Sequence, residues 1–225
     1  MNRYILLSEK EWHKELFKNL KEKFVNDEWF LIDSKSDFNL DNVTKINPRK
    51  IFIPHWSYII AGGIFNKFEC IVFHMTDLPY GRGGSPLQNL IIRGHKETKI
   101  SAIKVEVGID TGDIYLKKNL SLEGTAKEIL LSTNSIINEM IIEIIQNDLI
   151  PIPQSGEVVE FKRRKPEDGN ILLLNDINLI YDYIRMLDCE GYPNAFIETE
   201  TIKIEFSNAN LESNNITAHV RIFKK

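Results

Sequence analysis

The sequence predicts an α/β protein with a mainly parallel central sheet and a small C-terminal α+β module. Before residue 150, short apolar runs alternate with stretches of helical apolar spacing, an order typical of strands joined by crossover helices. A charged stretch at 157–169 then precedes a tail with one helical stretch and three apolar runs. We therefore expect a main domain at 1–155, a linker at about 156–169 and a module at 170–225.

The strands expected before residue 110 are apolar runs bounded by polar residues, at 4–7, 29–32, 51–54, 70–73 and 103–109. Residues 9–24 are predicted as a helix, because Trp12, Leu16, Leu20 and Phe24 recur at helical spacing. Residues 33–47 are rich in Asp, Asn and Ser and are predicted as a loop.

The second half begins with a long helix predicted at 125–147. Pro151 and Pro153 follow it, and proline ends helices because it lacks a backbone donor. In the tail we expect a helix at 176–187 and strands at 195–198, 201–206 and 216–223.

Composition limits the classes of function. Apolar residues make up 43% and charged residues 27% of the 225 residues, as in ordinary globular proteins. No apolar run reaches the roughly 20 residues of a membrane span, so we expect a cytoplasmic protein without a membrane partner. The net charge of -4 gives no general attraction for nucleic acid. The two cysteines are not paired in a metal-binding motif, and no metal is expected.

Residues 73–113 contain the candidate chemistry. His74 ends one apolar run and Asp110 ends a later one. If both runs are neighbouring parallel strands, both side chains lie at the carboxyl edge of the sheet, where α/β proteins bind ligands. We therefore predict that His74 and Asp110 form a catalytic pair.

This stretch resembles the signature of the folate-dependent formyltransferase superfamily. His74 matches the histidine of the family's Asn-x-His, and Leu78-Pro79 with Arg82-Gly83 matches its Leu-Pro-x-x-Arg-Gly loop. The turn at 110–112 matches its Asp-x-Gly. The chain departs at Val72, where the family has Asn, so the second oxyanion donor is not identified.

The resemblance implies a Rossmann-like core and N10-formyltetrahydrofolate as formyl donor, with no metal. Residues 55–61 align with the family's folate loop, which implies that Ser57, Tyr58, Ile59 and Ile60 bind the cofactor. Arg82 is predicted to bind the acceptor, because it lies in a Gly-rich loop before the helix start Ser85-Pro86. Asn89 is a further candidate for substrate binding.

Each candidate has a structural alternative. An isolated histidine is more often structural, and the carboxylate of an Asp-Thr-Gly turn often caps its own backbone. Arg82 could be a solvated loop charge, and Trp56 and Tyr58 could pack in the core. Asn89 could simply be polar surface on a short helix.

The acceptor is predicted from the tail and the charge. The segments 163–171 and 191–197 resemble those of formyltransferases with a C-terminal module, including enzymes of nucleotide-linked amino sugars. We expect transfer to a primary amine of such a sugar, no nucleic acid partner and a possible homodimer. The alternatives are a folate or nucleotide-sugar binding protein with weakened catalysis, or an enzyme similar to methionyl-tRNA formyltransferase with another acceptor.

Overall fold

The computed structural model describes residues 1–225, and the chain forms two compact units. The first unit contains residues 1–82, 99–120 and 132–160; the second contains 83–98, 121–131 and 161–225. The last boundary lies between Glu160 and Phe161, within the stretch predicted as a linker, but neither unit is one continuous segment.

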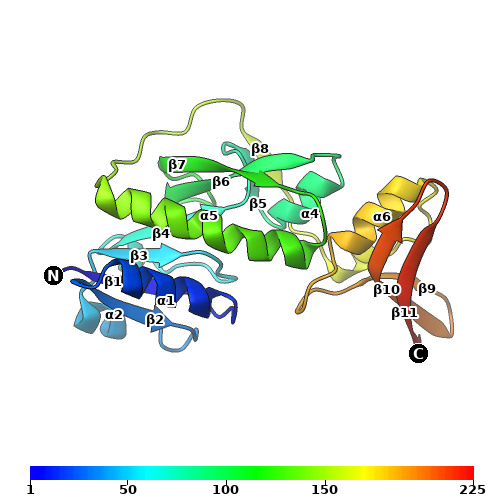
Figure 1. Ribbon diagram of the computed structural model, residues 1–225, viewed down its shortest axis with the longest axis horizontal. Helices are drawn as coiled ribbons and strands as arrows, with labels where there is room; N and C mark the ends of the chain where they lie inside the picture. Colours follow the sequence, from blue (N-terminus) through cyan, green and yellow to red (C-terminus); the bar gives the residue numbers. More distant parts are fainter. The chain divides into compact units, whose positions relative to one another are not determined.

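The first unit is built on a six-stranded sheet with the order β2-β1-β3-β4-β6-β7 (Figure 1). Its strands are β1 (Arg3–Leu7), β2 (Glu28–Ile32), β3 (Lys50–Ile53), β4 (Glu69–His74), β6 (Glu97–Lys104) and β7 (Ile114–Ser121). The strands β1 to β4 pair in parallel, whereas β6 runs antiparallel to β4. The predicted Rossmann-like α/β fold with a mainly parallel sheet is confirmed.

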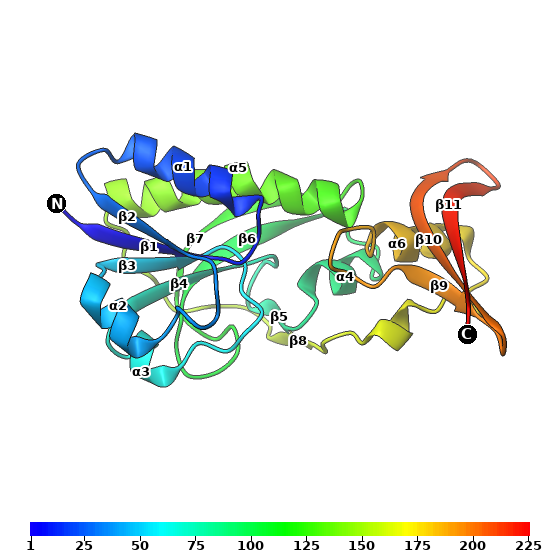
Figure 2. The ribbon, with the colours of Figure 1, turned by 90° about the horizontal axis from the view of Figure 1, so that it is seen from below.

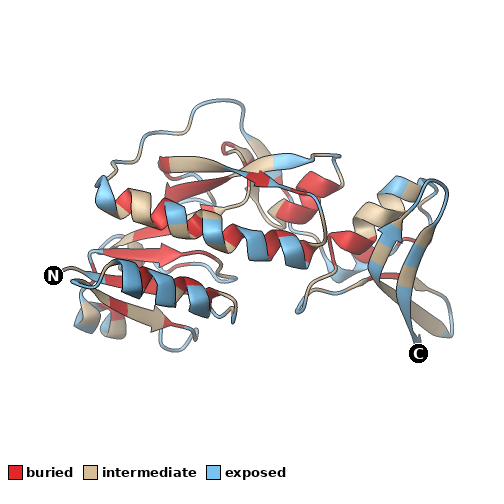
Figure 3. Cartoon of the chain, viewed as in Figure 1, coloured by how far each residue is buried: buried red, intermediate tan, exposed pale blue.

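Helices cover both faces of this sheet. Helices α1 (His13–Lys23) and α5 (Ala126–Gln146) lie over one face, and α2 (Leu40–Ile46) and α3 (Gly62–Phe65) lie on the other (Figure 2). Burial on both faces explains why β1 and β3 are almost wholly apolar and buried (Figure 3). On α1, Leu16 and Leu20 of the predicted stripe are buried.

Two local predictions in the N-terminal half are corrected. The helix predicted from residue 9 begins at His13. The segment predicted as a loop, 33–47, contains α2, which begins because the Asn39 side chain accepts a hydrogen bond from Asn42 N at 3.0 Å. Asparagine signals a helix start as well as a turn, and the composition alone did not separate the two.

The prediction of a strand at 103–109 is wrong. Strand β6 ends at Lys104, and the chain then forms an irregular loop to Asp113. The apolar residues of that loop face solvent, Val107 being 85% and Ile109 69% exposed. Gly108 and Asp110 have positive φ angles of 108° and 54°, which no strand residue adopts. Asp110 therefore lies on a loop after an antiparallel strand, and not at the end of a parallel one.

The second unit contains α4 (Pro86–Ile91), the 3₁₀ turn η1 (Pro166–Gly169), α6 (Ile177–Arg185) and an antiparallel sheet. The order of this sheet is β11-β10-β9, with β9 at Ala195–Glu198, β10 at Ile202–Leu211 and β11 at Ile216–Lys224. Helix α6 packs against β10. The helix and the three strands predicted in the tail are therefore present. A separate two-stranded sheet pairs β5 (Tyr80–Gly83) with β8 (Val159–Phe161). None of the helices combines the length and apolar character that crossing a membrane requires.

Candidate active site

His74 lies at the last residue of β4 between two polar partners. Its Nε2 is 2.8 Å from the carbonyl oxygen of Gly81, and its Nδ1 is 3.5 Å from Oδ2 of Asp110. A carbonyl only accepts, so Nε2 carries a proton in this arrangement. A second proton on Nδ1 would face the Asp110 carboxylate. The structure thus brings the predicted pair together, although Asp110 arrives from a loop.

The carbonyl of Gly81 lies in a loop that is tied by side-chain hydrogen bonds. Thr76 Oγ1 also donates to it at 3.3 Å, and Ser101 Oγ donates to the carbonyl of Thr76 at 2.7 Å. At the start of the loop, Lys117 Nζ is 2.5 Å from Asp77. Burial disfavours the charge of Asp77, but this bond helps to hold the pKa of its carboxyl below the usual value. The imidazole of His74 therefore meets a fixed acceptor.

Gln154 joins the Asp110 turn to Arg82. Its Nε2 donates to the carbonyl oxygens of Asp110 and Gly112, both at 2.8 Å. Its Oε1 accepts from Nε and Nη2 of Arg82 at 3.1 and 2.8 Å. Gln154 was not predicted from the sequence, because Pro151 and Pro153 indicate only the end of a helix. The signal was the strand-like bridge between Ile114 and Ile152, which no local pattern reveals.

The predicted folate loop, 55–61, has no regular secondary structure. Ile60 is buried in the core, whereas Ile59 is 92% and Tyr58 40% exposed. The Tyr58 ring contacts that of Trp56 edge-on, with centroids 5.2 Å apart. The backbone groups of 57–60 make no hydrogen bond within the chain. An apolar surface beside unpaired amides suits a flat heterocycle with hydrogen-bonding edges, so the loop fits a pterin.

Comparisons with known proteins identify the family of the chain. A solved structure titled methionyl-tRNA formyltransferase from Clostridium thermocellum is 47% identical, with a TM-score of 0.97, and each chain covers 100% of the other. The chain belongs to the methionyl-tRNA formyltransferase family. The family model of the methionyl-tRNA formyltransferase C-terminal domain matches residues 166–223. The resemblance to formyltransferases is therefore confirmed.

Two further similar proteins show how far the similarity extends. The methionyl-tRNA formyltransferase of Rickettsia felis is 30% identical over 144 residues, which is 61% of this chain and 48% of that protein. The match thus spans about half the length of such curated relatives. A 4-N formyltransferase from Francisella tularensis is 19% identical, with a TM-score of 0.67 and coverage of 89% and 93%. At that identity the likeness shows the fold alone.

These findings correct the predicted partners. The expectation of no nucleic acid partner is contradicted, because the family is named for an aminoacylated tRNA. The expectation of a nucleotide sugar is not supported by this family membership. The error came from the net charge of -4, which says nothing about where charges lie. Lys162, Arg163, Arg164 and Lys165 form a basic run that the total conceals.

Asn89 is engaged by backbone groups in this member of the family. Its Nδ2 donates to the carbonyls of Gly84 and Lys162, each at 2.9 Å, and of Ser85 at 3.0 Å. Its Oδ1 accepts from Arg93. These contacts favour the structural alternative for Asn89, and its role in substrate binding stays a prediction. Ser85 stands at the start of α4, but its side chain does not cap the helix.

A histidine pair lies elsewhere at the carboxyl edge of the same sheet. Ser8, which follows β1, shares a hydrogen bond of 2.6 Å between its Oγ and Nδ1 of His13. Burial, helped by the neighbouring His55, lowers the pKa of His13 to about 3. Burial also lowers the pKa of His55, which follows β3, to about 4. Both imidazoles are therefore neutral at physiological pH.

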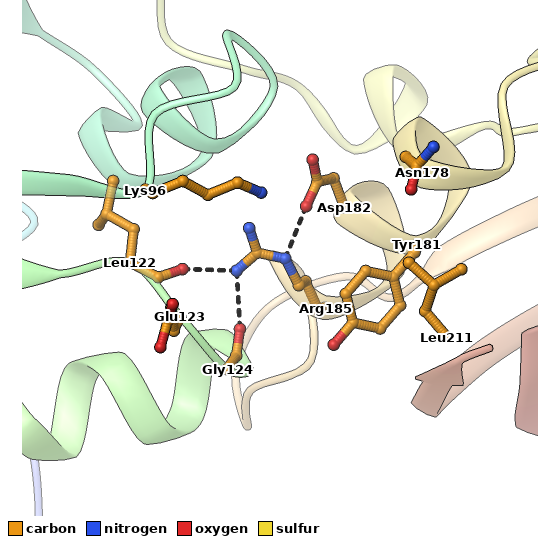
Figure 4. Close-up of a pocket in the computed structure, with 9 residues that line it drawn as sticks. All are labelled: Lys96, Leu122, Glu123, Gly124, Asn178, Tyr181, Asp182, Arg185 and Leu211. Carbon is orange, nitrogen blue, oxygen red and sulfur yellow. Dashed lines mark hydrogen bonds and ion pairs between the residues drawn. The ribbon is translucent and has the colours of Figure 1, made fainter. Parts of the chain in front are cut away.

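A cavity in the second unit is separate from these residues. It measures about 260 Å³, and Arg185 lies at its wall (Figure 4). The guanidinium is paired with Asp182 at 2.6 Å and donates to the carbonyls of Leu122 and Gly124. None of the predicted site residues lines it. Because Nε and Nη1 of this arginine already donate to protein groups, we interpret this cavity as structural. No group of three or more His, Cys, Asp or Glu side chains is placed to hold a metal ion.

Proposed function

We propose that the protein transfers the formyl group of N10-formyltetrahydrofolate to the α-amino group of methionine on methionyl-tRNA. The observation that supports this most strongly is the 47% identity with the Clostridium thermocellum methionyl-tRNA formyltransferase over the whole of both chains. The match of 166–223 to that family's C-terminal domain supports it independently.

His74 and Asp110 are the proposed catalytic residues. The amine nitrogen attacks the formyl carbon, the carbon–N10 bond breaks, and a proton moves from the amine to N10. The hydrogen that Nε2 of His74 donates to Gly81 is the one we assign to the developing oxyanion, so the formyl oxygen and this carbonyl compete for it. Asp110 faces the other nitrogen of the ring, where it orients the imidazole and can take the proton from the amine.

The remaining predicted residues would bind the two substrates. The unpaired backbone of 57–60 is the proposed cradle for the pterin of the donor. The basic run beside η1 is the proposed contact with the tRNA, since Lys162, Arg163 and Lys165 are exposed. Contacts with phosphates make the binding constant fall as salt is added. The logarithm of the binding constant falls with the logarithm of the salt concentration, with a slope of roughly 0.7 to 0.9 for each phosphate neutralised.

Formylation of methionyl-tRNA by the purified protein tests the activity. We expect formyl-methionyl-tRNA to form with N10-formyltetrahydrofolate as donor, and no product with uncharged tRNA or free methionine. Absence of product with a folded protein would overturn the proposal. Product formation on a small amino sugar instead would assign another acceptor.

A charge-removal variant tests the tRNA contact. The triple substitution Lys162→Ala, Arg163→Ala, Lys165→Ala should raise KM for methionyl-tRNA, reduce its salt dependence and leave KM for the donor unchanged. The matched control replaces Lys18, Lys21 and Lys23, which are exposed on α1, with Ala. An equal rise in KM for both triple variants would mean that the basic run has no specific role.

A further inference from the structure

Gln154 has every hydrogen-bonding position of its amide occupied. The two N–H groups of its side chain donate hydrogen bonds to the carbonyls of Asp110 and Gly112, and the side-chain oxygen accepts two hydrogen bonds from Arg82. An amide offers two donors and one oxygen with two lone pairs, so nothing is left for a substrate. Any role of Gln154 in the reaction must act through the residues that it holds.

Gln154 holds the turn that positions the Asp110 carboxylate. Asp110 has a φ of 54°, a conformation that costs a non-glycine residue free energy and persists only where the surrounding structure imposes it. Gln154 holds the carbonyls on either side of Thr111, and Thr111 Oγ1 ties the turn to Val107 O at 3.0 Å. The separation of 3.5 Å between Asp110 and His74 therefore depends on this turn.

We propose that Gln154 is a positioning residue for formyl transfer, which fixes the Asp110 turn against His74 by donating to its two carbonyls. Arg82 has a supporting part, because it holds the oxygen of the amide and thereby directs the two donors at the turn. This inference rests on the proposed function, and it assigns to Arg82 a task other than contact with the acceptor.

Three substitutions separate the bonds that Gln154 donates to the Asp110 turn from those that it accepts from Arg82. Gln154→Met removes all four bonds at similar size. Gln154→Glu keeps an acceptor for Arg82 but sets a carboxylate against two carbonyls. Gln154→Lys keeps donors for the turn but places a cation beside Arg82. Gln154→Met and Gln154→Glu should lower kcat about 10- to 100-fold, as displacements of about 1 Å do, with KM for both substrates within about threefold. Gln154→Lys should retain more kcat than either.

The matched control is Gln146→Glu, the same change at an exposed position of α5, which should leave kcat and KM as they are. Near-normal kcat in folded Gln154→Met would overturn the proposal. A normal kcat for Gln154→Glu, together with a kcat for Gln154→Lys as low as that of Gln154→Met, would also overturn it. The bond to Arg82 alone would then matter. A rise in KM with unchanged kcat would also overturn the proposal. It would indicate that Gln154 contributes equally to binding the substrate and the transition state, and not to positioning the catalytic groups.

A second measurement does not depend on activity. Amide hydrogen exchange of 108–113 should quicken in Gln154→Met and not in Gln146→Glu. If the wild-type protein forms no product while this difference is seen, the proposed function fails and the restraint on the turn stands. If exchange is the same in both variants, the restraint is absent and the inference fails whatever the activity.

Discussion

Strand β4 holds a titratable side chain at each end, and the two ends differ in how closely that side chain meets its ion-pair partner. At its first residue, Glu69 contacts Lys50 Nζ and accepts from Tyr115 Oη at 2.5 Å. At its last residue, His74 meets Asp110 only at 3.5 Å. The Lys50 side chain is 6% exposed, and its ammonium also lies over the Tyr115 ring.

The difference separates stability from chemistry. At the amino end, burial together with Glu69 raises the pKa of the Tyr115 hydroxyl, which keeps its proton and donates it. In that cluster the Lys50 ammonium and the Tyr115 hydroxyl are both engaged by Glu69. At the carboxyl end, the contact of 3.5 Å between His74 and Asp110 is longer than a hydrogen bond, as catalytic contacts in unliganded active sites often are.

The largest expected effect is at the amino end. Glu69→Leu should lower the free energy of unfolding by about 3 to 5 kcal/mol, because it leaves the buried Lys50 ammonium unpaired. Lys50→Met should cost much less, since Glu69 is 34% exposed and can be hydrated. Urea unfolding measures both. Equal losses, or a double variant no better than Glu69→Leu, would contradict this account.

At the carboxyl end, His74→Ala should lower turnover by about 100-fold or more through loss of an oxyanion donor. Its melting temperature should change little compared with that of Glu69→Leu, because His74 is held by one strong bond. Steady-state formylation and thermal unfolding measure the two effects. Turnover close to that of the wild type in a folded variant would place the catalytic group elsewhere.

A pH effect should also arise at the carboxyl edge. His13 and His55 have folded pKa values of about 3 and 4, whereas an unfolded histidine binds its proton near pH 6.5. As the pH falls below about 6.5, His13 and His55 bind protons in the unfolded chain but stay neutral in the folded chain. Stability is therefore complete above that pH and is lost toward pH 4, by up to about 1.4 kcal/mol per pH unit for each histidine.

The substitution His13→Gln should reduce this slope, because glutamine can still hydrogen-bond to Ser8 without titrating. Urea unfolding between pH 7 and pH 5 measures it. His219→Gln, at an exposed position on β11, is the matched control and should retain the wild-type slope. If the two variants have the same slope, His13 is not the group that the acid protonates.

The smallest effect is expected for Val72→Asn, which restores the family's Asn-x-His. Residues 72 and 74 point to the same face of β4, so an amide at 72 should approach the oxyanion and raise kcat a few-fold. Val72 packs against two apolar clusters of the core, so stability should fall by about 1 to 3 kcal/mol. Lower stability without a gain in kcat would show that the second donor comes from elsewhere.

Local patterns predicted the strands β1 to β4 and the helices α1, α5 and α6. His74 and Asp110 lie together as predicted, but the parallel strand from which this was argued is absent. The local patterns failed at α2, whose Asn39 cap also suits a turn, at the loop before Asp110, and at contacts between residues far apart in the sequence. The run before Asp110 has the apolar composition of a strand, yet positive φ angles at Gly108 and Asp110 make it a loop. Gln154 acts through carbonyls 42 and 44 positions away, a distance at which sequence spacing carries no information.

Gly112 gives the Asp110 turn a distinct mutational character. A Cβ built there would lie 1.7 Å from the carbonyl oxygen of Lys104, a backbone atom that cannot swing aside as a side chain does. Every residue other than glycine carries that carbon, so the objection applies to alanine as much as to tryptophan. In a library that samples all amino acids along this loop, position 112 should therefore return only glycine among active clones, whereas the exposed Val107 and Ile109 should tolerate many replacements.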